Sequence, residues 1–489
     1  MRVGRALNAV LRGGSALTLA SALVVMMIPG KALSQGAEVQ AFAGAGGTPQ
    51  VLWSLPIGAE DGDEDEVDGI AVDDGGNVAI SGIMRGGLAL GGEMMPSRGQ
   101  GDIFLARYNV EGALLWKKSI GGPGGDNTFD LQMDGAGNII ISGWFSGQVD
   151  FGGSVLQSQG GTDMFLAKYA TNGALVWAQS FGGSGEDGGN ELSVSANGEI
   201  AVAAISGGGF TINGQGYDGG GERDSFLLRI GSGGNLIWAL PFAGPGTERI
   251  RGLSMNNAGE VFLGFQYRGS ISTAGTTLQS RGGWDGAVAK VSANGQGQWI
   301  LAVGGKGTDN VRGIAAGPGG SVYAAGVFEG PATIAGQEEP SIGKKGDDFL
   351  MQLTSSGELA WINTAGGTGP GTGAEIRADS RGVLVSGLIA TPLTLRHNRD
   401  KIAEFTSPSG QPTSYLAGFT PNGDLRFVYS PSPSGKGSAA LGDVPGVSPN
   451  GRYAVQSLRF RGTLSVAGST MRTPSKKDSA IILLRLNGA

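Results

Sequence analysis

The chain has 489 residues, of which 94 are glycine and 40% are apolar, so a packed core is possible. The glycines have no collagen-like period, which excludes a collagen-like structure. It contains no cysteine, which excludes disulfides and thiolate metal sites. The net charge is −7, and because residues 1–34 carry four basic and no acidic side chains, the remainder carries −11, which argues against a nucleic-acid partner.

Residues 1–34 have the pattern of a secretory signal peptide. Three arginines come first, an apolar stretch runs from Ala16 to Ile28, and Ala32 and Ser34 are the small residues that a cleavage site requires. An uncleaved anchor is the alternative, although the apolar stretch is shorter than the roughly 20 residues of a membrane span. We expect an extracytoplasmic protein without stable membrane insertion after cleavage, beginning with a flexible linker over residues 35–50.

From residue 51 onward the sequence repeats with a period of roughly 61 residues. The clearest series consists of aromatic residues: Trp53, Trp116, Trp177, Trp238, Trp299, Trp361 and Phe427. A second series places an aspartate before an apolar strand: Asp102, Asp163, Asp224, Asp285 and Asp347, with Thr413 sixth and Asp478 seventh. A third series is a hairpin, first seen in Ile70–Asp73 and Val78–Gly82. All three series count seven units, which indicates a repeat architecture.

Each unit reads as four strands that are apolar at consecutive positions, which is typical of sheets buried on both faces. The repeat begins with an isolated tryptophan strand, Val51–Trp53, and ends at Leu486 without a tryptophan strand of its own. The first strand can therefore complete the last unit and remove an exposed sheet edge. We predict an all-β fold, a single seven-bladed propeller over residues 51–489, closed by its N-terminal strand.

The repeat resembles the bacterial seven-bladed β-propeller repeat family (SBBP-type repeats) and, more loosely, the NHL-type propellers. The resemblance rests on Gly121–Asp126, Met133–Ile139 and Gly161–Tyr169, and extends over about residues 51–489. It implies that the Ile-Ala-Val-Asp strand is innermost, that the tryptophan strand is outermost and that the source is a bacterium. It implies no single activity.

Residues that recur in every blade are expected to be structural. The tryptophans should pack between blades, with exposed sugar-stacking platforms as the alternative. An acid follows each tryptophan strand, at Asp65, Asp126, Asp187, Glu248 and Asp309, and we expect it to accept hydrogen bonds from glycine N–H groups.

Calcium is an alternative for one acidic segment. Seven carboxylates crowd into residues 60–68, and Asp61, Asp63 and Asp65 would be the ligands, since a hard cation relieves such repulsion. A solvated acidic loop is the competing interpretation. No other cofactor is expected.

Positions that vary between blades are the candidates for a ligand site. Two residues before the innermost Ile, successive blades carry Asp68, Phe129, Asn190, Arg251, Arg312 and Ala374. In the strand order that the resemblance implies, this column lines one mouth of the central channel. Together with Arg249, the arginines would make one side basic and suited to a carboxylate or sulfate. The alternative is internal pairing, of Arg251 with Glu248 or of Arg312 with Asp309.

Two further segments could contact a partner. Trp284 stands where other blades carry unrelated residues, so it is predicted to offer a surface aromatic face, with partial burial as the alternative. Residues 396–401 are predicted to form an exposed loop that contains His397, the only histidine of the chain.

These features favour a non-catalytic binding or scaffolding module for a protein partner in the cell envelope or outside the cell. A propeller that binds glycans or anionic polymers is the alternative. A single histidine excludes a Ser-His-Asp triad of credible geometry, together with multi-histidine metal sites. A carboxylate-based enzyme acting on polysaccharides is the third interpretation, because it needs only two acids.

Overall fold

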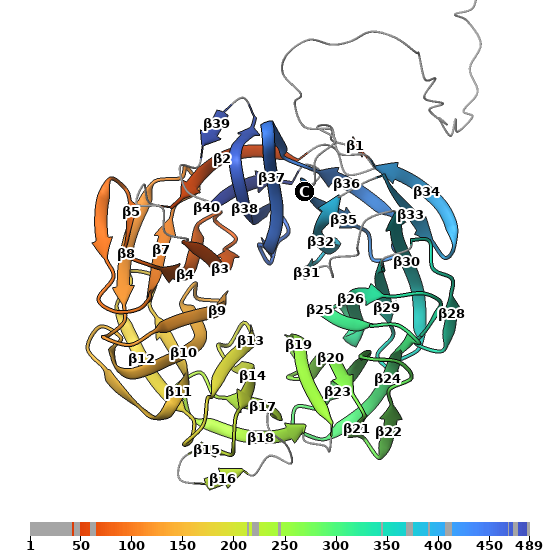
Figure 1. Cartoon of the computed structure of the whole chain (residues 1–489), viewed down its shortest axis with the longest axis horizontal. Helices are drawn as coiled ribbons and strands as arrows, with labels where there is room; N and C mark the ends of the chain where they lie inside the picture. The colour runs from red at the N-terminus through yellow and green to blue at the C-terminus, as the bar shows by residue number, and fades with distance from the viewer. Residues whose placement is uncertain are drawn as a thin grey trace, which may run out of the picture. The chain divides into compact units, whose positions relative to one another are not determined.

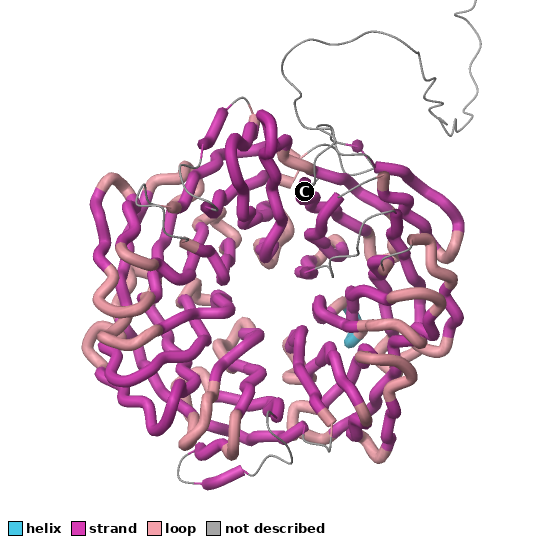
Figure 2. Tube along the Cα trace, viewed as in Figure 1, coloured by secondary structure: helices cyan, strands magenta, loops and turns pink. Residues whose placement is uncertain are grey.

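The computed structural model describes residues 42–43, 49–58, 65–212, 215–217, 224–242, 246–343, 346–367, 375–389, 392–405, 413–467, 469–472 and 478–486. The chain divides into two compact units, Met1–Gly36 and Ala37–Ala489, and every described residue belongs to the second. Seven β-sheet blades surround a central axis in that unit (Figure 1). Figure 2 shows strands joined by loops, with a single helical turn, η1 (Pro318–Gly320), in the part that the structure describes.

Each blade contains four main strands, ordered from the axis outward and paired antiparallel within the blade. Blades 1 and 2 consist of β3 (Glu66–Val72), β4 (Val78–Met84), β7 (Asp102–Tyr108) and β8 (Leu114–Ile120), then β9 (Asp126–Met133), β10 (Ile139–Asp150), β11 (Val155–Tyr169) and β12 (Leu175–Phe181). Blades 3 and 4 consist of β13 (Gly188–Val194), β14 (Ile200–Ser206), β17 (Asp224–Ile230) and β18 (Leu236–Phe242), then β19 (Thr247–Met255), β20 (Val261–Arg268), β23 (Asp285–Val291) and β24 (Gly297–Gly305).

The remaining blades follow the same order. Blades 5 and 6 consist of β25 (Asn310–Ala316), β26 (Val322–Phe328), β29 (Asp347–Leu353) and β30 (Leu359–Gly367), then β31 (Glu375–Asp379), β32 (Gly382–Ile389), β35 (Thr413–Phe419) and β36 (Leu425–Tyr429). Blade 7 consists of β37 (Ser432–Val447), β38 (Tyr453–Val466), β40 (Asp478–Arg485) and β2 (Gln50–Ile57).

Short strands lie at the rim and come, in sequence, between the second and third main strands of a blade. They are β5 (Gly87–Leu90) and β6 (Glu93–Pro96), β15 (Phe210–Ile212) and β16 (Gln215–Tyr217), β21 (Ser270–Thr273) and β22 (Thr276–Gln279), β27 (Ala332–Ile334) and β28 (Gln337–Glu339), β33 (Leu393–His397) and β34 (Asp400–Phe405), and β39 (Ser469–Arg472). Residues 396–401, expected as an exposed loop, span the tip of the β33–β34 hairpin: residues 398–401 are exposed as expected, but only residues 398–399 lie outside the two strands. Its strand β33 pairs with β30 of blade 5, so backbone pairing organises a segment that polarity alone had marked as irregular.

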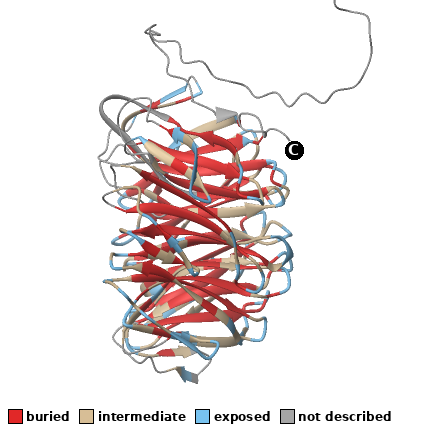
Figure 3. Cartoon of the chain, turned by 90° about the vertical axis from the view of Figure 1, so that its right-hand side faces the viewer, coloured by how far each residue is buried: buried red, intermediate tan, exposed pale blue. Residues whose placement is uncertain are grey.

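The core lies in the two middle strands of each blade. Every residue of β4 and of β7 is buried, and the same holds for β17 and β23 in blades 3 and 4. In Figure 3 these buried segments lie inside the stacked blades, while exposed residues concentrate in the connecting loops. The consecutive apolar residues of the sequence therefore mark sheets covered on both faces, as predicted.

The recurring tryptophans pack between blades, as predicted. The indole N–H of Trp116 in blade 1 donates a 2.8 Å hydrogen bond to the carbonyl of Thr171 in blade 2. Beside it, Gly173 has φ of +83°, and a Cβ there would lie 2.9 Å from the Trp116 ring. The same bond to the following blade is made by Trp53, Trp177, Trp238, Trp299 and Trp361.

The first and last parts of the chain close the ring, as predicted. Strand β2 pairs antiparallel with β40, from Gln50 opposite Arg485 to Ile57 opposite Ser479. The hydroxyl of Ser479 also accepts a hydrogen bond from the backbone N–H of Val67 in blade 1. A two-residue strand, β1 (Phe42–Ala43), pairs with β36 of blade 6. In the described residues, no helix is long and apolar enough to cross a bilayer.

Candidate functional site

The innermost strands carry a β-bulge at the position that the sequence singled out. The pairing register between the first and second strands of blades 1, 2, 4 and 5 skips one residue, and the skipped residues are Asp68, Phe129, Arg251 and Arg312. In blade 3, both Asn190 and Glu191 fall within the skipped stretch. A bulge leaves its residue unpaired and redirects the side chain. Five successive blades therefore use this irregularity where the inner strands face the axis (Figure 1).

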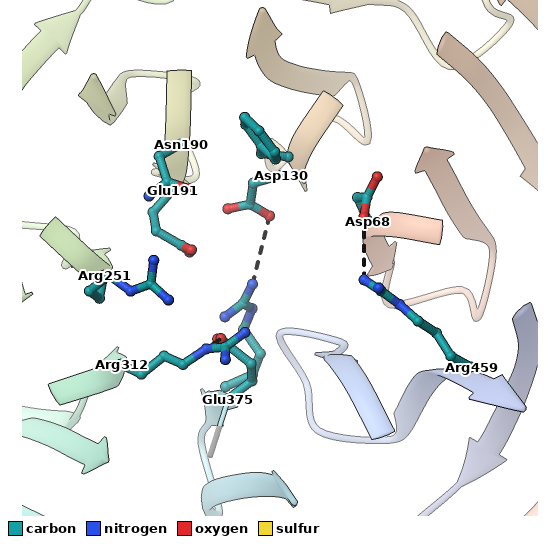
Figure 4. Close-up of a pocket in the computed structure, with 10 residues that line it drawn as sticks. Asp68, Asp130, Asn190, Glu191, Arg251, Arg312, Glu375 and Arg459 are labelled. Atoms are coloured by element: carbon teal, nitrogen blue, oxygen red, sulfur yellow. Dashed lines mark hydrogen bonds and ion pairs between the residues drawn. The ribbon is translucent and has the colours of Figure 1, made fainter. Parts of the chain in front are cut away.

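These residues line one charged cavity of about 160 Å³ at the axis (Figure 4). Of the predicted channel-mouth residues, the structure brings Asp68, Asn190, Arg251 and Arg312 to it, together with Phe129, which is 41% exposed. Ala374, also in that column, lies outside the described residues. Five residues that the sequence reasoning did not select complete the lining: Asp130, Glu191, Glu375, Arg377 and Arg459. The cavity thus contains four carboxylates and four guanidinium groups.

Three of the four arginines form ion pairs across blade boundaries. The Nε of Arg312 in blade 5 lies 2.6 Å from Oε1 of Glu375 in blade 6. Arg377 of blade 6 lies 3.7 Å from Oδ1 of Asp130 in blade 2, and Arg459 of blade 7 lies 3.7 Å from Oδ1 of Asp68 in blade 1 (Figure 4). Arg312 therefore pairs with Glu375 rather than with Asp309, the partner that the sequence had suggested.

Arg251 and Glu191 have no such partner. Among the described residues, neither side chain makes a hydrogen bond or an ion pair. In Figure 4 the Glu191 carboxylate and the Arg251 guanidinium extend from neighbouring inner strands into the same cavity. A guanidinium without a carboxylate partner, held in a partly enclosed polar cavity, is suited to bind an anion from outside.

The electrostatics of the cavity favour a protonated Glu191. Burial raises the pKa of Glu191 well above its usual value, and the neighbouring carboxylates of Glu375 and Asp130 raise it further, while Arg377 and Arg312 oppose this. Burial also raises the pKa of Asp130. The pKa of Arg251 is lowered by burial and by the like charge of Arg312. The acids, more than the arginines, are thus expected to change protonation here.

Asp130 connects the cavity to the backbone of two inner strands. Its two carboxylate oxygens accept hydrogen bonds from the backbone N–H groups of Leu131 and Leu192. Arg377, its ion-pair partner, also lines a second cavity of about 720 Å³ formed by the inner strands and their turns. The Asp130–Arg377 pair therefore stands where the small charged cavity borders the larger one.

The other predicted site residues lie elsewhere. Arg249 is exposed and does not line the cavity; its guanidinium lies over the ring of Trp284, 5.3 Å from the ring centre. Trp284 is half-buried, and part of its face is covered by this contact. The bulge at Arg251 explains the separation, because the alternation that would place residues 249 and 251 on one face is broken there.

The candidate calcium ligands are only partly visible. Asp61 and Asp63 lie outside the described residues. Asp65 is 1% exposed, and its Oδ1 accepts a hydrogen bond from the backbone N–H of Arg85. Within the described ranges, no three acidic or histidine side chains are grouped to hold a metal ion.

The recurring loop acids act as backbone acceptors. Asp126 accepts hydrogen bonds from the N–H groups of Gly122 and Ser146, and Asp309 accepts them from Gly305 and Glu329. Asp187 repeats the arrangement in blade 3. Each carboxylate thus links, by hydrogen bonds, its glycine loop to the backbone near the end of the second strand of the same blade. This is the structural role expected from the sequence.

His397 is engaged through both ring nitrogens. Its Nδ1 lies 2.7 Å from Oδ1 of Asn363, and its Nε2 lies 3.1 Å from Nδ2 of Asn398. The ring is half-buried beside Trp361, with a centre-to-centre distance of 6.3 Å. These contacts give the histidine a place in packing the β33–β34 hairpin against blade 5.

The acids that sequence reasoning missed had a detectable signal. One position beyond the bulge column, the first six blades carry Gly69, Asp130, Glu191, Gly252, Gly313 and Glu375. Glycine in three blades is typical of a position with little room for a side chain. The acids in the other three blades are not required by the fold. Arg377 and Arg459 carry no comparable signal, since Arg459 comes from the second strand of blade 7.

The fold and the site together define a seven-bladed β-propeller with one charged, asymmetric cavity at its axis. No family model matches the chain. No curated protein shows a significant match to it. The chain is similar to the solved WD40 domain of Pan2 from Neurospora crassa, with 10% identity over 87% of this chain and 90% of that one, at a TM-score of 0.41.

Two bacterial structures are also distantly similar. A protein from Lactobacillus plantarum has 13% identity over 82% of this chain and 98% of its own, with a TM-score of 0.40. The periplasmic gluconolactonase PpgL from Pseudomonas aeruginosa has 13% identity over 71% of this chain and 99% of its own, with a TM-score of 0.31. Similarities this distant carry no argument about function.

Proposed function

We propose that this protein is an exported, non-catalytic binding module that holds a carboxylate-bearing segment of a protein partner at the axial cavity. One observation carries the proposal: Arg251 lines the cavity without an ion pair among the described residues, whereas Arg312, Arg377 and Arg459 all have one. Even a half-buried guanidinium is costly unless it is paired, so an anion from outside would be favoured beside Arg251.

The site favours one ligand per molecule. The bulge positions that line the cavity vary between blades, with an acid, an aromatic, an amide and two arginines, whereas the recurring residues bind backbone groups or pack between blades. A multivalent lectin would repeat its binding residues instead. The cavity of about 160 Å³ is single and small, which favours one small group of a ligand over an extended binding surface.

A role in catalysis has less support. Both ring nitrogens of His397 are occupied by asparagines, and the recurring aspartates accept backbone hydrogen bonds. In the cavity, Asp130 and Glu375 hold arginines. These groups are therefore used in holding the protein together rather than left available for proton transfer.

Location and kinship belong to the same proposal. Export is inferred from the signal-like residues 1–34, and membership in the bacterial propeller-repeat family from the resemblance of the repeat itself. The proposed location is the periplasm, the cell surface or the medium of a bacterium, where a partner would meet the exposed axial cavity.

The test is binding of the purified protein to arrays of acidic peptides and acidic polysaccharides. Arg251→Ala should abolish binding, while Arg249→Ala, which removes the same charge from an exposed position outside the cavity, should not. Binding to peptides supports the protein-partner proposal, and binding only to polysaccharides replaces it with the glycan alternative. An equal loss of affinity in both variants would show that binding depends on net charge rather than on the cavity. Release of sugar fragments would overturn the non-catalytic assignment.

A further inference from the structure

The unpaired residues of the axial cavity come as an adjacent acid and base. Glu191 lies on β13 and Arg251 on β19, the inner strands of blades 3 and 4. Both side chains extend into the cavity, yet no contact within ion-pairing distance joins them among the described residues. The carboxylates and guanidiniums are equal in number, so three pairs leave this acid and this base over.

In the part of the chain that the structure describes, Glu191 is surrounded by charged side chains from several neighbouring strands. Asp130 faces it from β9, Arg251 from β19, Arg312 from β25, and Glu375 and Arg377 from β31. Asp68 of β3 and Arg459 of β38 complete the ring of charges across the cavity. Two of the nearest groups are carboxylates already bound to arginines, so an additional negative charge on Glu191 is disfavoured by burial and by repulsion.

We propose that Glu191 and Arg251 form a single subsite that holds one carboxylate group of the ligand. The inference rests on the proposed function and names the chemistry of its site. One ligand oxygen accepts hydrogen bonds from the Arg251 guanidinium, and the other accepts the hydroxyl hydrogen of the Glu191 carboxyl group. The proton remains on Glu191, so no covalent bond forms or breaks.

The charge balance of the cavity supports a singly charged carboxylate. With Glu191 neutral, three carboxylates face four guanidiniums, and the net charge of +1 is cancelled by one carboxylate. With Glu191 ionised, the cavity is neutral, Glu191 repels the ligand, and Arg251 gains an internal counter-charge. A carboxylate is therefore bound together with a proton, and its affinity must depend on pH.

The direction of this dependence follows from linkage. Below the pKa of Glu191 in the free protein, the subsite is already protonated and affinity is constant. Above that pKa, binding must take up one proton, and affinity falls about tenfold per pH unit. The carboxyl of a glutamate side chain has a pKa of about 4.3, so a ligand of this type stays ionised above pH 5.5 and contributes nothing to the fall.

The experiment is calorimetric titration of the purified protein with N-acetylglutamic acid α-amide, and in parallel with glucuronate, at pH values from 5.5 to 10, because the raised pKa of Glu191 sets where the fall in affinity begins. N-acetylglutamine amide and glucose serve as neutral controls. Titrations in two buffers of different ionisation enthalpy measure the protons taken up on binding. The wild-type protein is compared with Glu191→Gln, which keeps a hydrogen-bond donor without a titratable proton, and with Arg249→Ala as a control outside the cavity.

The inference expects affinity to fall with rising pH and proton uptake to approach one per ligand, while Glu191→Gln binds with a flat profile and no uptake. A flat wild-type profile, or an unchanged pH dependence in Glu191→Gln, would overturn the inference and leave the proposed function standing. Failure of both carboxylates to bind at every pH would instead overturn the carboxylate site itself. The two probes separate peptide from sugar sources of the same group.

Discussion

The indole N–H of Trp177 donates a hydrogen bond of 3.1 Å to the carbonyl oxygen of Ser232, a turn residue of the next blade. The Trp177 ring also lies against Gly234 of that turn, where φ is +91°. Blade junctions of this kind combine a buried aromatic face with one directed hydrogen bond, and the two contributions can be separated by substitution.

Trp177→Ala should destabilise the protein by about 3 kcal/mol, because it removes a large, half-buried ring from a blade junction. Trp177→Phe keeps an aromatic ring and loses only the N–H donor, so about 1 kcal/mol is expected. Denaturant unfolding of the three proteins measures both values. Equal losses for Phe and Ala would show that the hydrogen bond, rather than the ring, dominates the junction.

The turn glycine opposite each tryptophan should be harder to replace than a glycine of similar backbone conformation elsewhere. Gly173 has φ of +83°, and a Cβ there would press on Trp116, whereas Gly92 has φ of +80° and open space around it. Gly92→Ala should cost the 1–2 kcal/mol of a left-handed conformation, roughly. Gly173→Ala should cost about 1–3 kcal/mol more for the overlap. Similar unfolding midpoints for both variants would contradict the packing role.

The fold could be predicted because its repeating residues solve the same packing problem in each blade. The one aromatic exception also has a physical explanation. Blade 6 carries Phe427 in place of tryptophan, and blade 7, being assembled from β40 and β2, has no turn between its last two strands. Because blade 7 offers no turn carbonyl to accept a hydrogen bond from an indole N–H, a tryptophan at this position would gain no hydrogen bond. The buried Phe427 supplies the packing contact.

The candidate site was harder to predict because it depends on irregular pairing. The alternation of a regular strand places Arg249 and Arg251 on one face, but the bulge at Arg251 separates them. Glu191 lies one residue beyond the chosen column and is brought in by the bulge of blade 3, which spans two residues. Arg459 comes from a second strand in a blade that departs from the repeat. Such local shifts have no signature in hydrophobic periodicity.

Ring closure should depend on β2 and little on the segment before it. Deletion through Ile57 removes the fourth strand of blade 7 and exposes the edge of β40, so we expect loss of cooperative unfolding or a large drop in melting temperature. Among the described residues, deletion through residue 48 removes the two-residue pairing of β1 with β36, and it should change the midpoint slightly. Calorimetry compares the two truncations with the parent chain, and identical curves for both would contradict closure by β2.

The buried loop acids should make the protein less stable as pH rises through about 6. Burial raises the pKa of Asp126 to about 6, and that of Asp309 likewise to about 6, above the unfolded value of about 3.9. The folded protein therefore binds these protons more tightly, and the stability they contribute, on the order of 2 kcal/mol each, is present below pH 4 and lost as pH passes 6.

Substitution isolates this contribution from that of other titrating groups. Asp126→Asn and Asp309→Asn should each lower stability at pH 5 more than at pH 8, because the amide cannot take up the proton. The double variant should show about twice the change in slope, since the two residues lie three blades apart. Unfolding free energies at pH 5 and pH 8 provide the comparison, and parallel pH profiles for parent and double variant would refute the assignment.

The two central arginines of the axial cavity should differ in what they contribute to folding, whatever the ligand is. Arg312→Ala leaves Glu375 without its ion-pair partner, and because the Arg312 side chain is 40% exposed, the loss should be no more than about 1 kcal/mol. Arg251→Ala removes a half-buried guanidinium that has no ion pair among the described residues and lies beside Arg312, so stability should hold or rise. Addition of Glu375→Gln to Arg312→Ala should restore part of the loss. Unfolding midpoints of the four proteins at pH 7 measure this, and a larger loss for Arg251→Ala than for Arg312→Ala would show that Arg251 serves the fold rather than a ligand.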